Sequence, residues 1–513
     1  MEHYDVIIIG TGAGGGTLAH RLAPSGKRIL LLERGGYLPR ERENWDSEEV
    51  FARERYVTTE RWYDKHGVAF RPHAQYFVGG NTKVYGGVLL RMRERDFEEV
   101  EHYGGVSPAW PISYADLEPY YDEAERLYLV HGQAGEDPTE PPRSGQFPYP
   151  PLTHEPRIQQ LHDDLARAGH RPFHLPVGLD LNESDREAGR CVRCDRFDGF
   201  PCPTDGKADA HVVCVRPALT NANVTLRTHA RVKRLEVDPS GRSVERVVVD
   251  GGEAYRADVI VVSCGAVNSA TLLLRSAADG HPDGLANSSG VVGRHYMAHI
   301  NTAVIAVSRT PNATKFQKTL GLNDYYWGAE DSDLPLGHIQ MLGKSDRTIL
   351  RGGAPRFAPG PALDYVARHA LDFWLTTEDL PHSDNRVTVD RAGNIHLAKT
   401  YHNTEPHRRL LGKLKALLGR LDCHRVAPTR WSALSEQLPL AGIAHNCGTV
   451  RFGTDPRQSA LDTNCKAHDI DNLYVVDTSF FPSSSAVNPS LTTIANALRV
   501  GDHLLERLGA QRR

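Results

Sequence analysis

Residues 4–34 combine two unbroken apolar runs with a glycine-rich turn between them. The run VIII at 6–9 is entirely β-branched, which is typical of a strand that a parallel sheet buries on both faces. Residues 15–23 have helical character, and RILLLE at 28–33 predicts a second strand. The order of strand, turn, helix and strand predicts the beginning of an α/β fold.

Similar patterns return later in the chain. Further strands are predicted within 223–237, at 246–250 and at 257–263. The segment NLYVVDTSFFP at 472–482 contains another buried strand, and a helix is predicted after Pro489, because proline suits the first helical position. Strands and helices alternate at both ends of the chain, whereas the middle differs, so we expect an α/β fold with an inserted second domain.

Three segments outside these strands have other patterns. Residues 132–151 are rich in Pro and Gly and predict a loop or linker. Residues 345–362 (SDRTILRGGAPRFAPGPA) predict a long, mobile loop of the kind that often acts as a lid. Residues 407–421 carry leucines at helical spacing, and we expect this helix to pack its leucines on the domain, the alternative being a helix on a membrane surface.

Composition and charge narrow the class of protein. The chain has 513 residues, of which 40% are hydrophobic and 24% charged, and its net charge is -4. This balance offers no electrostatic footprint for nucleic acid, and no apolar run is long enough for a membrane span. The first strand begins near Tyr4, which leaves no room for a signal peptide, so we expect a cytoplasmic protein. The oligomeric state stays open.

The turn after the first strand reads Gly10-x-Gly12-x-x-Gly15. In a dinucleotide fingerprint the first glycine permits a tight turn, the second lets the backbone approach a pyrophosphate, and the third lets helix and strand pack closely. Glu33 ends the second strand, where a carboxylate can accept from both ribose hydroxyls and would repel a 2′-phosphate. These features in one register favour a bound dinucleotide other than NADP.

The rest of the sequence indicates whether the expected dinucleotide is FAD or NAD. The strands of 223–263 and the C-terminal strand at YVVD can both return to the sheet that carries the fingerprint. A nucleotide fold built from three separate chain segments is typical of flavin enzymes. The sequence therefore favours FAD.

Four motifs are spread over nearly the whole chain. They are the fingerprint with ERG at 33–35, FVGGNTKVYGG at 77–87, SCGAVNSATLLLRSA at 263–277, and HNCGTVRFG at 445–453 followed by LYVVDTSFFPSSSAVNPSLTTIANALR. On these motifs the chain resembles the glucose–methanol–choline (GMC) oxidoreductase family. Less specific features, such as SPAWPISYADLEPYY and GEDPTE, resemble the pyranose oxidases, above all the bacterial branch that oxidises C-3 of glucosides and C-glycosides.

The resemblance implies a fold and a division into domains. We expect the GMC fold, an α/β protein with a Rossmann-like FAD-binding domain and an α+β substrate-binding domain on an antiparallel sheet. Residues 1–90, 190–296 and 441–513 would form the discontinuous FAD-binding domain. Residues 91–189 and 297–440 would form the substrate-binding domain.

The resemblance also implies a set of flavin contacts. The loop at 79–87 would lie against the flavin ring, where glycine permits close approach. Fungal pyranose oxidases bind their flavin covalently through a histidine of this loop, but Val84 stands at that place here, so we expect non-covalent FAD. The expected FAD contacts are Gly10, Gly12, Ala13, Gly14, Gly15, Glu33, Arg34, Gly80, Asn81, Thr82, Val84, Tyr85, Gly86, Val232, Cys264, Gly265, Asn268, Asp477, Asn488, Pro489 and Ser490.

His445 and Asn488 are the candidate catalytic residues. Oxidation of an alcohol needs a base for the hydroxyl proton, and a histidine, with a pKa near neutrality, suits that task. The family pairs this histidine with a second His or Asn, here Asn488, whose amide can accept a hydrogen bond from the substrate but cannot titrate. The alternative for His445 is a buried histidine with no catalytic part. The helix after Pro489 would direct its positive dipole end to the flavin.

The expected reaction is the FAD-dependent oxidation of a sugar secondary hydroxyl to a ketone, with hydride passing to flavin N5 and electrons passing to O2 or a quinone. Candidate substrate contacts are Gln340, His338 and Thr376, besides His445 and Asn488. The alternatives are a dehydrogenase of another polyol or aminoglycoside-type alcohol and, from a different class, a non-redox lyase that keeps FAD. A binding protein without catalysis would not need His445 and Asn488.

Four cysteines, Cys191, Cys194, Cys202 and Cys214, lie close together in the sequence. They contain one CxxC pair but no second pair, so a zinc site would need another ligand such as His211. The open alternatives are reduced structural cysteines or one disulfide, a structural metal, and a redox role. We expect no metal in the active site.

Overall fold

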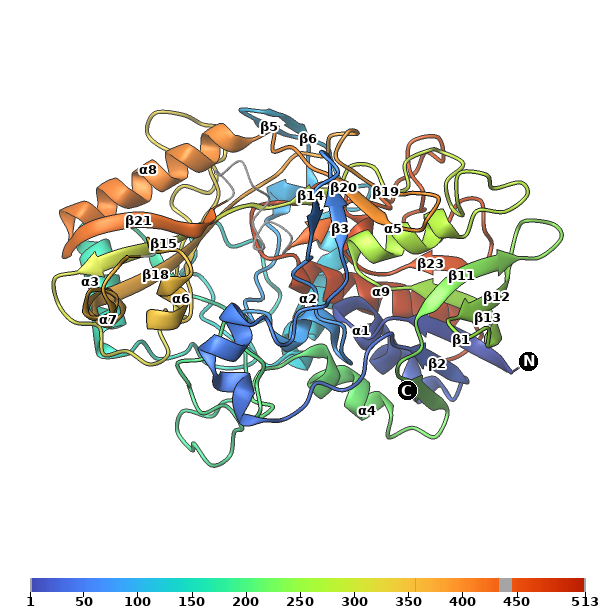
Figure 1. Ribbon diagram of the computed structural model, residues 1–513, viewed down its shortest axis with the longest axis horizontal. Helices are drawn as coiled ribbons and strands as arrows, with labels where there is room; N and C mark the ends of the chain where they lie inside the picture. Colours follow the sequence, from blue (N-terminus) through green and yellow to red (C-terminus); the bar gives the residue numbers. More distant parts are fainter. Residues whose placement is uncertain (1, 356, 433–444, 512–513) are drawn as a thin grey trace.

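Two large β-sheets organise the chain, and Figure 1 shows them at opposite ends of the molecule. The computed structural model describes residues 2–355, 357–432 and 445–511. The first sheet has seven strands in the order β10-β2-β1-β13-β12-β11, with β23 beside β13. These strands are β1 (His3–Ile9), β2 (Ile29–Leu32), β10 (Val224–Arg227), β11 (Val232–Val237), β12 (Val244–Val249), β13 (Ala254–Val262) and β23 (Leu473–Val475).

The first strand lies in the middle of the parallel part of this sheet. β1 pairs in parallel with β2 on one side and with β13 on the other, and Val6 to Ile9 are buried. Burial on both faces explains the unbroken β-branched run. α1 (Ala13–Leu22) follows the fingerprint and packs on α9 (Ser490–Arg507), so the helix after Pro489 and the C-terminal strand both return to the sheet that carries the fingerprint.

The second sheet is antiparallel, with six strands in the order β21-β15-β18-β17-β16-β8. Its residues alternate between two environments, as the period of a strand requires. Val304 and Ala306 of β15 belong to a core that includes leucines of α8, whereas Ala303, Ile305 and Val307 line a cavity on the opposite face, which Val304 also reaches. The strands are β8 (Pro172–His174), β15 (Ile300–Ser308), β16 (Leu320–Leu322), β17 (His338–Met341), β18 (Ala370–Thr377) and β21 (Cys423–Ser432).

α8 (Thr404–Arg420) is the helix expected at 407–421, and its leucines pack on the second sheet (Figure 1). Leu410, Leu414 and Leu418 are at most 1% exposed. Burying a leucine side chain stabilises a fold by about 1.5–3 kcal/mol, so this face holds the helix firmly on the domain. The leucines that a membrane-surface helix would expose to lipid are therefore buried against the second sheet.

The strands of the two sheets fall on either side of the proposed domain division. All seven strands of the first sheet lie in 1–90, 190–296 or 441–513, and all six strands of the second lie in 91–189 or 297–440. A four-stranded sheet crosses the division, because β20 (Ile395–Ala398) pairs with β3 (Trp62–Asp64). β19 (Arg386–Val389) and β4 (Ala69–Phe70) complete it. The proposed boundary at 440/441 falls outside the described residues.

The segment 345–362 differs from the long loop that its composition predicts. α6 (Arg347–Arg351) begins at Asp346, whose side chain accepts a hydrogen bond from the Ile349 amide at 2.9 Å. α7 (Gly360–His369) begins behind Pro359. These two helix-start signals outweigh the glycines and prolines between them. A lid function for this segment stays a prediction.

The remaining elements connect the two sheets. The helices are α2 (Tyr114–Leu127), α3 (Pro156–Arg167), α4 (Arg216–Ala218) and α5 (Ala266–Arg275), and the short strands are β5 (Val100–His102), β6 (Gly105–Ser107), β7 (Val130–His131), β9 (Val177–Gly178), β14 (Met297–Ala298) and β22 (Asn446–Cys447). The short 3₁₀ and π turns are η1 (Ala23–Ser25), η2 (Arg42–Trp45), η3 (Glu48–Ala52), η4 (Gly80–Lys83), η5 (Glu94–Phe97), η6 (His211–Val215) and η8 (Thr478–Phe480). α2 packs on α9, and β14 pairs with β22.

The clustered cysteines are free thiols. Cys191, Cys194, Cys202 and Cys214 form no disulfide, and burial raises the pKa of Cys191 to about 11. Within the described ranges no group of three or more His, Cys, Asp or Glu side chains is arranged to hold a metal ion. The choice among structural thiols, a structural metal and a redox role stays a prediction.

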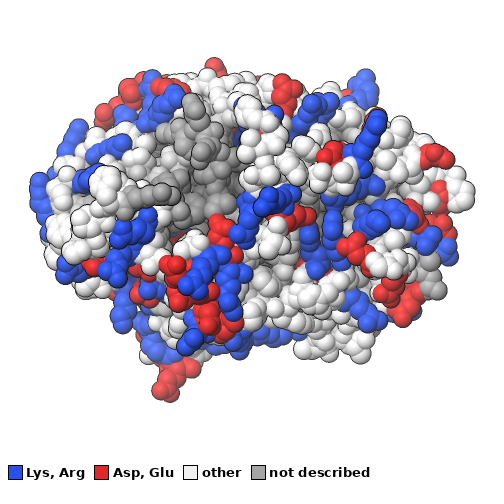
Figure 2. Space-filling model, in the orientation of Figure 1, with Lys and Arg blue, Asp and Glu red and all other residues white. Residues whose placement is uncertain are grey.

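The distribution of surface charge agrees with the near-neutral composition. On the face shown in Figure 2, basic and acidic side chains are interspersed and form no patch of a single sign. In the part of the chain that the structure describes, no helix is long and apolar enough to cross a membrane.

We predict that a buried ion pair between Lys399, which follows β20 of the four-stranded sheet, and Asp379, which follows β18 of the second sheet, stabilises the fold. The two side chains are bonded to each other and are 2% and 0% exposed. Lys399→Met should lower the free energy of unfolding by about 3–5 kcal/mol, because Asp379 would lose its buried partner. Chemical denaturation followed by circular dichroism measures the change. The double variant Lys399→Met/Asp379→Asn should lose less than the single variant, and equal stability of Lys399→Met and wild type would contradict this account.

Candidate active site

A cavity of about 780 Å³ begins where the parallel strands of the first sheet end and extends to the second sheet. Gly10, Glu33, Cys264 and Asp477, which follow β1, β2, β13 and β23, line one part of it. Ligands of open α/β sheets bind at this edge of the strands. Ile305 and other residues of the second sheet line the opposite part, so the cavity joins both domains.

The fingerprint forms a cradle at the first part of the cavity. The N-terminus of α1 has no side-chain cap, and a Cβ added at Gly12 would meet nothing within 4 Å. A Cβ at Gly14 would lie 1.9 Å from the Val476 carbonyl oxygen, and one at Gly15 would lie 2.2 Å from the Gly10 carbonyl oxygen. Gly12 therefore opens to the ligand, whereas Gly14 and Gly15 permit close packing. An uncapped helix N-terminus facing a cavity suits a pyrophosphate.

Glu33 lies at the expected ribose position. Its carboxylate accepts hydrogen bonds from the Thr11 hydroxyl at 2.5 Å and from the Gly35 amide at 3.0 Å. Burial raises the pKa of this carboxyl, although these hydrogen bonds oppose the effect. Beside it, the Arg34 guanidinium stacks on the Tyr76 ring, 3.6 Å from the ring centroid, and both line the cavity.

The flavin-facing loop at 79–87 is anchored by the short segment KADA at 207–210. Lys207 is fully buried and donates to the Tyr85 carbonyl oxygen at 2.9 Å. Asp209 accepts from Lys83 at 2.8 Å, and the Thr82 hydroxyl accepts from the Ala210 amide at 3.0 Å. These contacts fix the backbone of the loop at the cavity wall. No pattern in the sequence connects the two segments.

The N-terminus of α9 meets the same cavity. Its N-cap is Pro489, which offers no side-chain cap, and Asn488, Pro489, Ser490 and Thr493 line the wall. Free N–H groups at a helix start stabilise nearby negative charge. The expected position of this dipole beside a flavin is therefore compatible with the cavity.

The residues present fit an FAD. The cavity has two uncapped helix starts, a carboxylate at the ribose position and a glycine cradle. Of the expected cofactor contacts, Gly15 packs behind the wall. The others line it: Gly10, Gly12, Ala13, Gly14, Glu33, Arg34, Gly80, Asn81, Thr82, Val84, Tyr85, Gly86, Val232, Cys264, Gly265, Asn268, Asp477, Asn488, Pro489 and Ser490.

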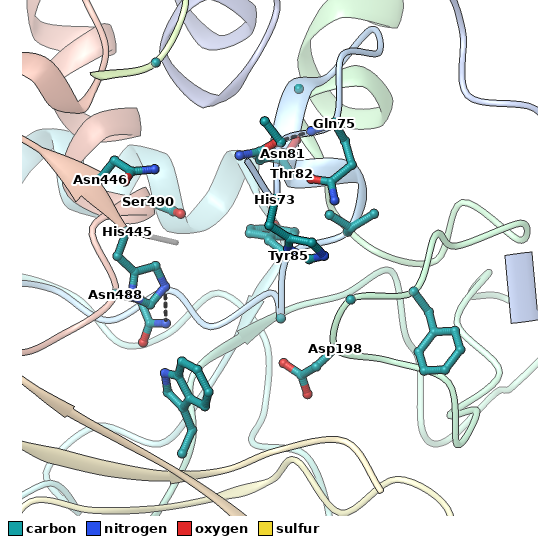
Figure 3. Close-up of a pocket in the computed structure, with 18 of the residues that line it drawn as sticks. His73, Gln75, Asn81, Thr82, Tyr85, Asp198, His445, Asn446, Asn488 and Ser490 are labelled. Carbon is teal, nitrogen blue, oxygen red and sulfur yellow. Dashed lines mark hydrogen bonds between the residues drawn. The ribbon is translucent and has the colours of Figure 1, made fainter. Parts of the chain in front are cut away.

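His445 and Asn488 lie side by side at the cavity wall, as Figure 3 shows. The Asn488 Nδ2 atom is 3.4 Å from the His445 Nε2 atom. The Asn488 Oδ1 atom is buried and has no hydrogen-bond partner among the described residues. His445 stands just before β22 in a left-handed backbone conformation with φ of 60°, which is uncommon outside glycine and often marks a functional residue.

The surroundings of His445 correct the expectation of a near-neutral pKa. Burial lowers its pKa well below 6.5, and the neighbouring charges of His299, Lys318 and His338 add to this effect. The folded protein therefore keeps the imidazole neutral at pH 7 and loses the neutral form only in acid. The Asn488 donor faces the histidine, and its expected role as a hydrogen-bond acceptor for the substrate stays a prediction.

The three further substrate candidates have different places. Gln340 of β17 lines the cavity. His338 is buried behind it, 3.1 Å from the Gln340 Oε1 atom, and burial lowers its pKa to about 4. The Thr376 hydroxyl donates to the Ala486 carbonyl oxygen at 2.6 Å and supports the loop before α9 instead.

A partly buried ion pair in the cavity wall was missed in the sequence. Lys318 donates to Asp198, and its side chain is only 2% exposed. A Cβ added at Gly86 would lie 2.2 Å from both charged groups, so the pair touches the flavin-facing loop. Figure 3 shows Asp198 on the side of the cavity away from Asn81 and Thr82. The two residues belong to segments without any motif, and only the fold brings them together.

Comparison with known proteins identifies related chains. Family models described as GMC oxidoreductase match residues 5–301 and 381–497. The chain is 33% identical to the 6'''-hydroxyparomomycin C oxidase of Streptomyces lividus, over 99% of this chain and 92% of that protein. It is 30% identical to the paromamine 6'-oxidase of Streptomyces fradiae, over 97% of this chain and 90% of that protein.

Solved structures share the fold. Pyridoxine 4-oxidase from Mesorbium loti has a TM-score of 0.69 at 19% identity, covering 98% of this chain and 99% of that chain. A formate oxidase of Aspergillus oryzae, solved to follow the modification of its FAD, has a TM-score of 0.66 at 14% identity, covering 99% of this chain and 98% of that chain. At these identities the likeness shows the fold alone.

We predict that Gly12 and Gly14 have different roles, Gly12 in binding FAD and Gly14 in packing of the apoprotein. Gly12→Ala should leave the stability of the apoprotein unchanged but weaken FAD binding about tenfold to a hundredfold, because the added methyl group occupies the cradle at a cost of roughly 1–3 kcal/mol. Gly14→Ala is the matched control and should destabilise the apoprotein itself, because its Cβ would lie 1.9 Å from the Val476 carbonyl oxygen. FAD titration by fluorescence and thermal unfolding measure the two effects. Unchanged FAD affinity in Gly12→Ala would contradict the assignment.

Proposed function

The chain belongs to the GMC oxidoreductase family, and on that premise we propose that it oxidises a secondary hydroxyl of a neutral sugar, at C-3 or C-2 of a glucoside, C-glycoside or pyranose, to a ketone. Members of this family use FAD, and this chain is an FAD oxidoreductase that acts on CH–OH groups. The observation that carries the proposal is the pair of His445 and Asn488 at the wall of the cofactor cavity, 3.4 Å apart.

His445 is the proposed base. Its Nε2 atom faces Asn488, and the lowered pKa keeps the ring neutral at physiological pH. A neutral imidazole nitrogen can take the hydroxyl proton as the carbon loses hydride. When bound, FAD supplies the acceptor for that hydride.

Asn488 holds the substrate oxygen. Since its Nδ2 atom points to the same region as His445 Nε2, a hydroxyl between them can donate to the imidazole and accept from the amide. Such a two-point contact fixes the direction of the O–H bond toward the base. The amide keeps its charge state at every working pH, so a single group titrates in this pair.

The Asp198–Lys318 pair is the proposed recognition element for further hydroxyls. A carboxylate accepts from one hydroxyl and an ammonium donates to the next, which suits a vicinal diol, and hydrogen bonds to charged groups are stronger than neutral ones. Lys318 is close enough to His445 for its charge to lower the pKa of that ring. Gln340 and Trp374 line the same cavity and add an amide and an apolar surface.

The charge of this pair favours a neutral sugar over the aminoglycosides in the names of two relatives. Because Lys318 neutralises Asp198, the pair has no net charge and suits hydroxyls better than ammonium groups. An aminoglycoside-type alcohol remains the second candidate, and it is favoured by the 33% and 30% identities to the aminoglycoside oxidases. A lyase would use the same pair without hydride transfer.

We predict that anaerobic addition of glucose or an aryl C-glucoside bleaches the visible flavin absorption of the holoenzyme. Return of colour in air would identify O2 as electron acceptor, with hydrogen peroxide as product, and return only with a quinone would identify a dehydrogenase. Paromamine serves as the competing substrate. Faster bleaching by paromamine than by either sugar would overturn the sugar proposal, and an oxidised spectrum with every alcohol would favour the lyase.

Removal of the base is the matched control for this experiment. His445→Ala should bind FAD but slow bleaching by about a hundredfold or more, since general-base catalysis contributes roughly 10²–10⁴ in rate. An unchanged bleaching rate in this variant would exclude His445 as the base.

We predict that Asp198 determines affinity for the sugar more than the rate of chemistry. Asp198→Asn should raise KM about tenfold, since a hydrogen bond to a charged group contributes roughly 1.5–3 kcal/mol, and should change kcat less. Asp331→Asn removes a carboxylate that pairs with Lys413 on the surface and is the matched control. Steady-state kinetics with the preferred sugar measure both constants. Equal KM values in the two variants would remove Asp198 from the substrate site.

A further inference from the structure

A buried histidine, His299, touches the proposed base. β14 pairs antiparallel with β22, so that Ala298 lies opposite Asn446. His299 follows β14 and His445 precedes β22, and the next step of the same ladder therefore brings the two rings together. Their Nδ1 atoms are 3.0 Å apart and their ring planes are inclined at 78°.

The partners of His299 decide which ring donates. Two ring nitrogens at 3.0 Å share one hydrogen, so one must donate and the other must accept. The His299 Nε2 atom lies 3.2 Å from the Ser484 carbonyl oxygen, which can only accept. His299 therefore carries its hydrogen on Nε2, and in a neutral ring its Nδ1 atom is the acceptor. His445 must then donate from Nδ1, which leaves its Nε2 atom with a free lone pair.

We propose that His299 is a positioning residue that fixes His445 in the tautomer with an unprotonated Nε2, the form that can take a proton from the substrate. This inference deepens the proposed function, because it rests on His445 as the base. The contact with Asn488 agrees with it, since the Asn488 Nδ2 group donates and needs a lone pair on His445 Nε2. A substrate hydroxyl that enters between the two groups would donate to this lone pair in place of the amide.

The charges around the two rings keep both of them neutral. Burial lowers the pKa of His299, while the Ser484 carbonyl and Glu378 oppose this effect. The Glu378 carboxylate also faces His102, at 3.2 Å, and accepts from the Ser107 hydroxyl at 2.5 Å. His445 faces His299, Lys318 and His338, and the positive charge of Lys318 disfavours an imidazolium. Both rings must be neutral for His445 to donate the single hydrogen that the two Nδ1 atoms share.

The acceptor for His299 is itself fixed. The Ser484 hydroxyl donates to the Asp379 carbonyl oxygen at 3.1 Å and accepts from the Asp379 amide at 3.3 Å. Asp379 is fully buried and bonded to Lys399. The loop that carries Ser484 continues to Asn488, so one segment orients both ends of the His299–His445 pair. Through this loop a change at His299 would affect the orientation of His445, which a residue that only packs in the core would not do.

Nitrogen NMR tests the tautomer without reference to activity. Holoenzyme labelled with ¹⁵N-histidine should show for His445 a pyridine-type Nε2 and a pyrrole-type Nδ1 above pH 6.5, and the resonances are assigned by their loss in His445→Gln. A pyrrole-type Nε2 on His445 would overturn the proposal whatever the substrate is. Failure of every sugar to bleach the flavin would instead overturn the proposed function and leave this reading of the spectrum intact.

Two variants separate the acceptor from the packing. His299→Asn keeps an acceptor at the position of Nδ1 and should retain the pyridine-type Nε2 of His445. His299→Leu has similar bulk without an acceptor and should slow flavin reduction roughly tenfold to a hundredfold at every pH above 6.5, with KM little changed, since the base loses its fixed form. Equal rates in His299→Leu and wild type would overturn the proposal. If His299→Leu does not fold, the spectrum of wild type and the rate of His299→Asn still decide it, and a hundredfold loss in His299→Asn would count against it.

A matched control addresses loss of stability. His407 is a fully buried histidine that bonds to the Thr302 and Thr377 hydroxyls at 2.8 and 2.9 Å. His407→Leu should destabilise the fold to a similar degree but leave the spectrum of His445 and the rate of flavin reduction unchanged. A shift of both in His407→Leu would mean that general destabilisation, and not the contact with His299, produces the effect.

Discussion

Hydrogen bonds from distant parts of the chain hold the loop between η8 and α9, and the geometry of the site depends on them. The Trp110 indole donates to the Ser483 hydroxyl at 2.8 Å, and the Thr376 hydroxyl donates to the Ala486 carbonyl oxygen at 2.6 Å. Asp379 fixes Ser484 between them. Because this loop joins the strand of the cofactor sheet to α9, the substrate domain and the cofactor domain meet at this backbone segment as well as in the four-stranded sheet. Polar backbone groups buried in this way must be paired, so the loop has little freedom to move.

The same burial explains why the proposed base is neutral. An imidazolium without a carboxylate partner is costly in a low-dielectric site, and the neighbouring Lys318 increases the cost. A base with a lowered pKa is a weaker base in water, yet it is fully available at neutral pH. The site therefore lowers the proton affinity of His445 but keeps its unprotonated form fully populated at neutral pH. The left-handed backbone at His445 and Ser485, with φ of 60° and 51°, persists because the surrounding hydrogen bonds fix both segments.

A local pattern was enough to predict the nucleotide cradle, because its parts lie within a few residues, whereas the other expected FAD contacts came from the family resemblance and stay predictions. Strand, glycine turn and helix lie next to one another in the sequence, and the residues expected at the FAD line the cavity apart from Gly15. The substrate half depends on contacts between distant segments. Lys318 and Asp198 are 120 positions apart, and His299 and His445 are 146 apart, so no local signal reveals either pair. The prediction of a long loop at 345–362 was wrong for another reason. Its glycines and prolines concealed the helix cap at Asp346.

The second sheet shows how one set of strands can serve two purposes. Along β15, residues 304 and 306 face the leucines of α8, and residues 303, 305 and 307 face the cavity. β18 repeats the arrangement, with Phe373 in the core and Trp374 at the cavity. Since the period of a strand is two, a substitution on the cavity face need not disturb the packing that holds the sheet. Substrate preference can therefore change on this face while the cofactor cradle and the His445–Asn488 pair, which come from other segments, stay as they are.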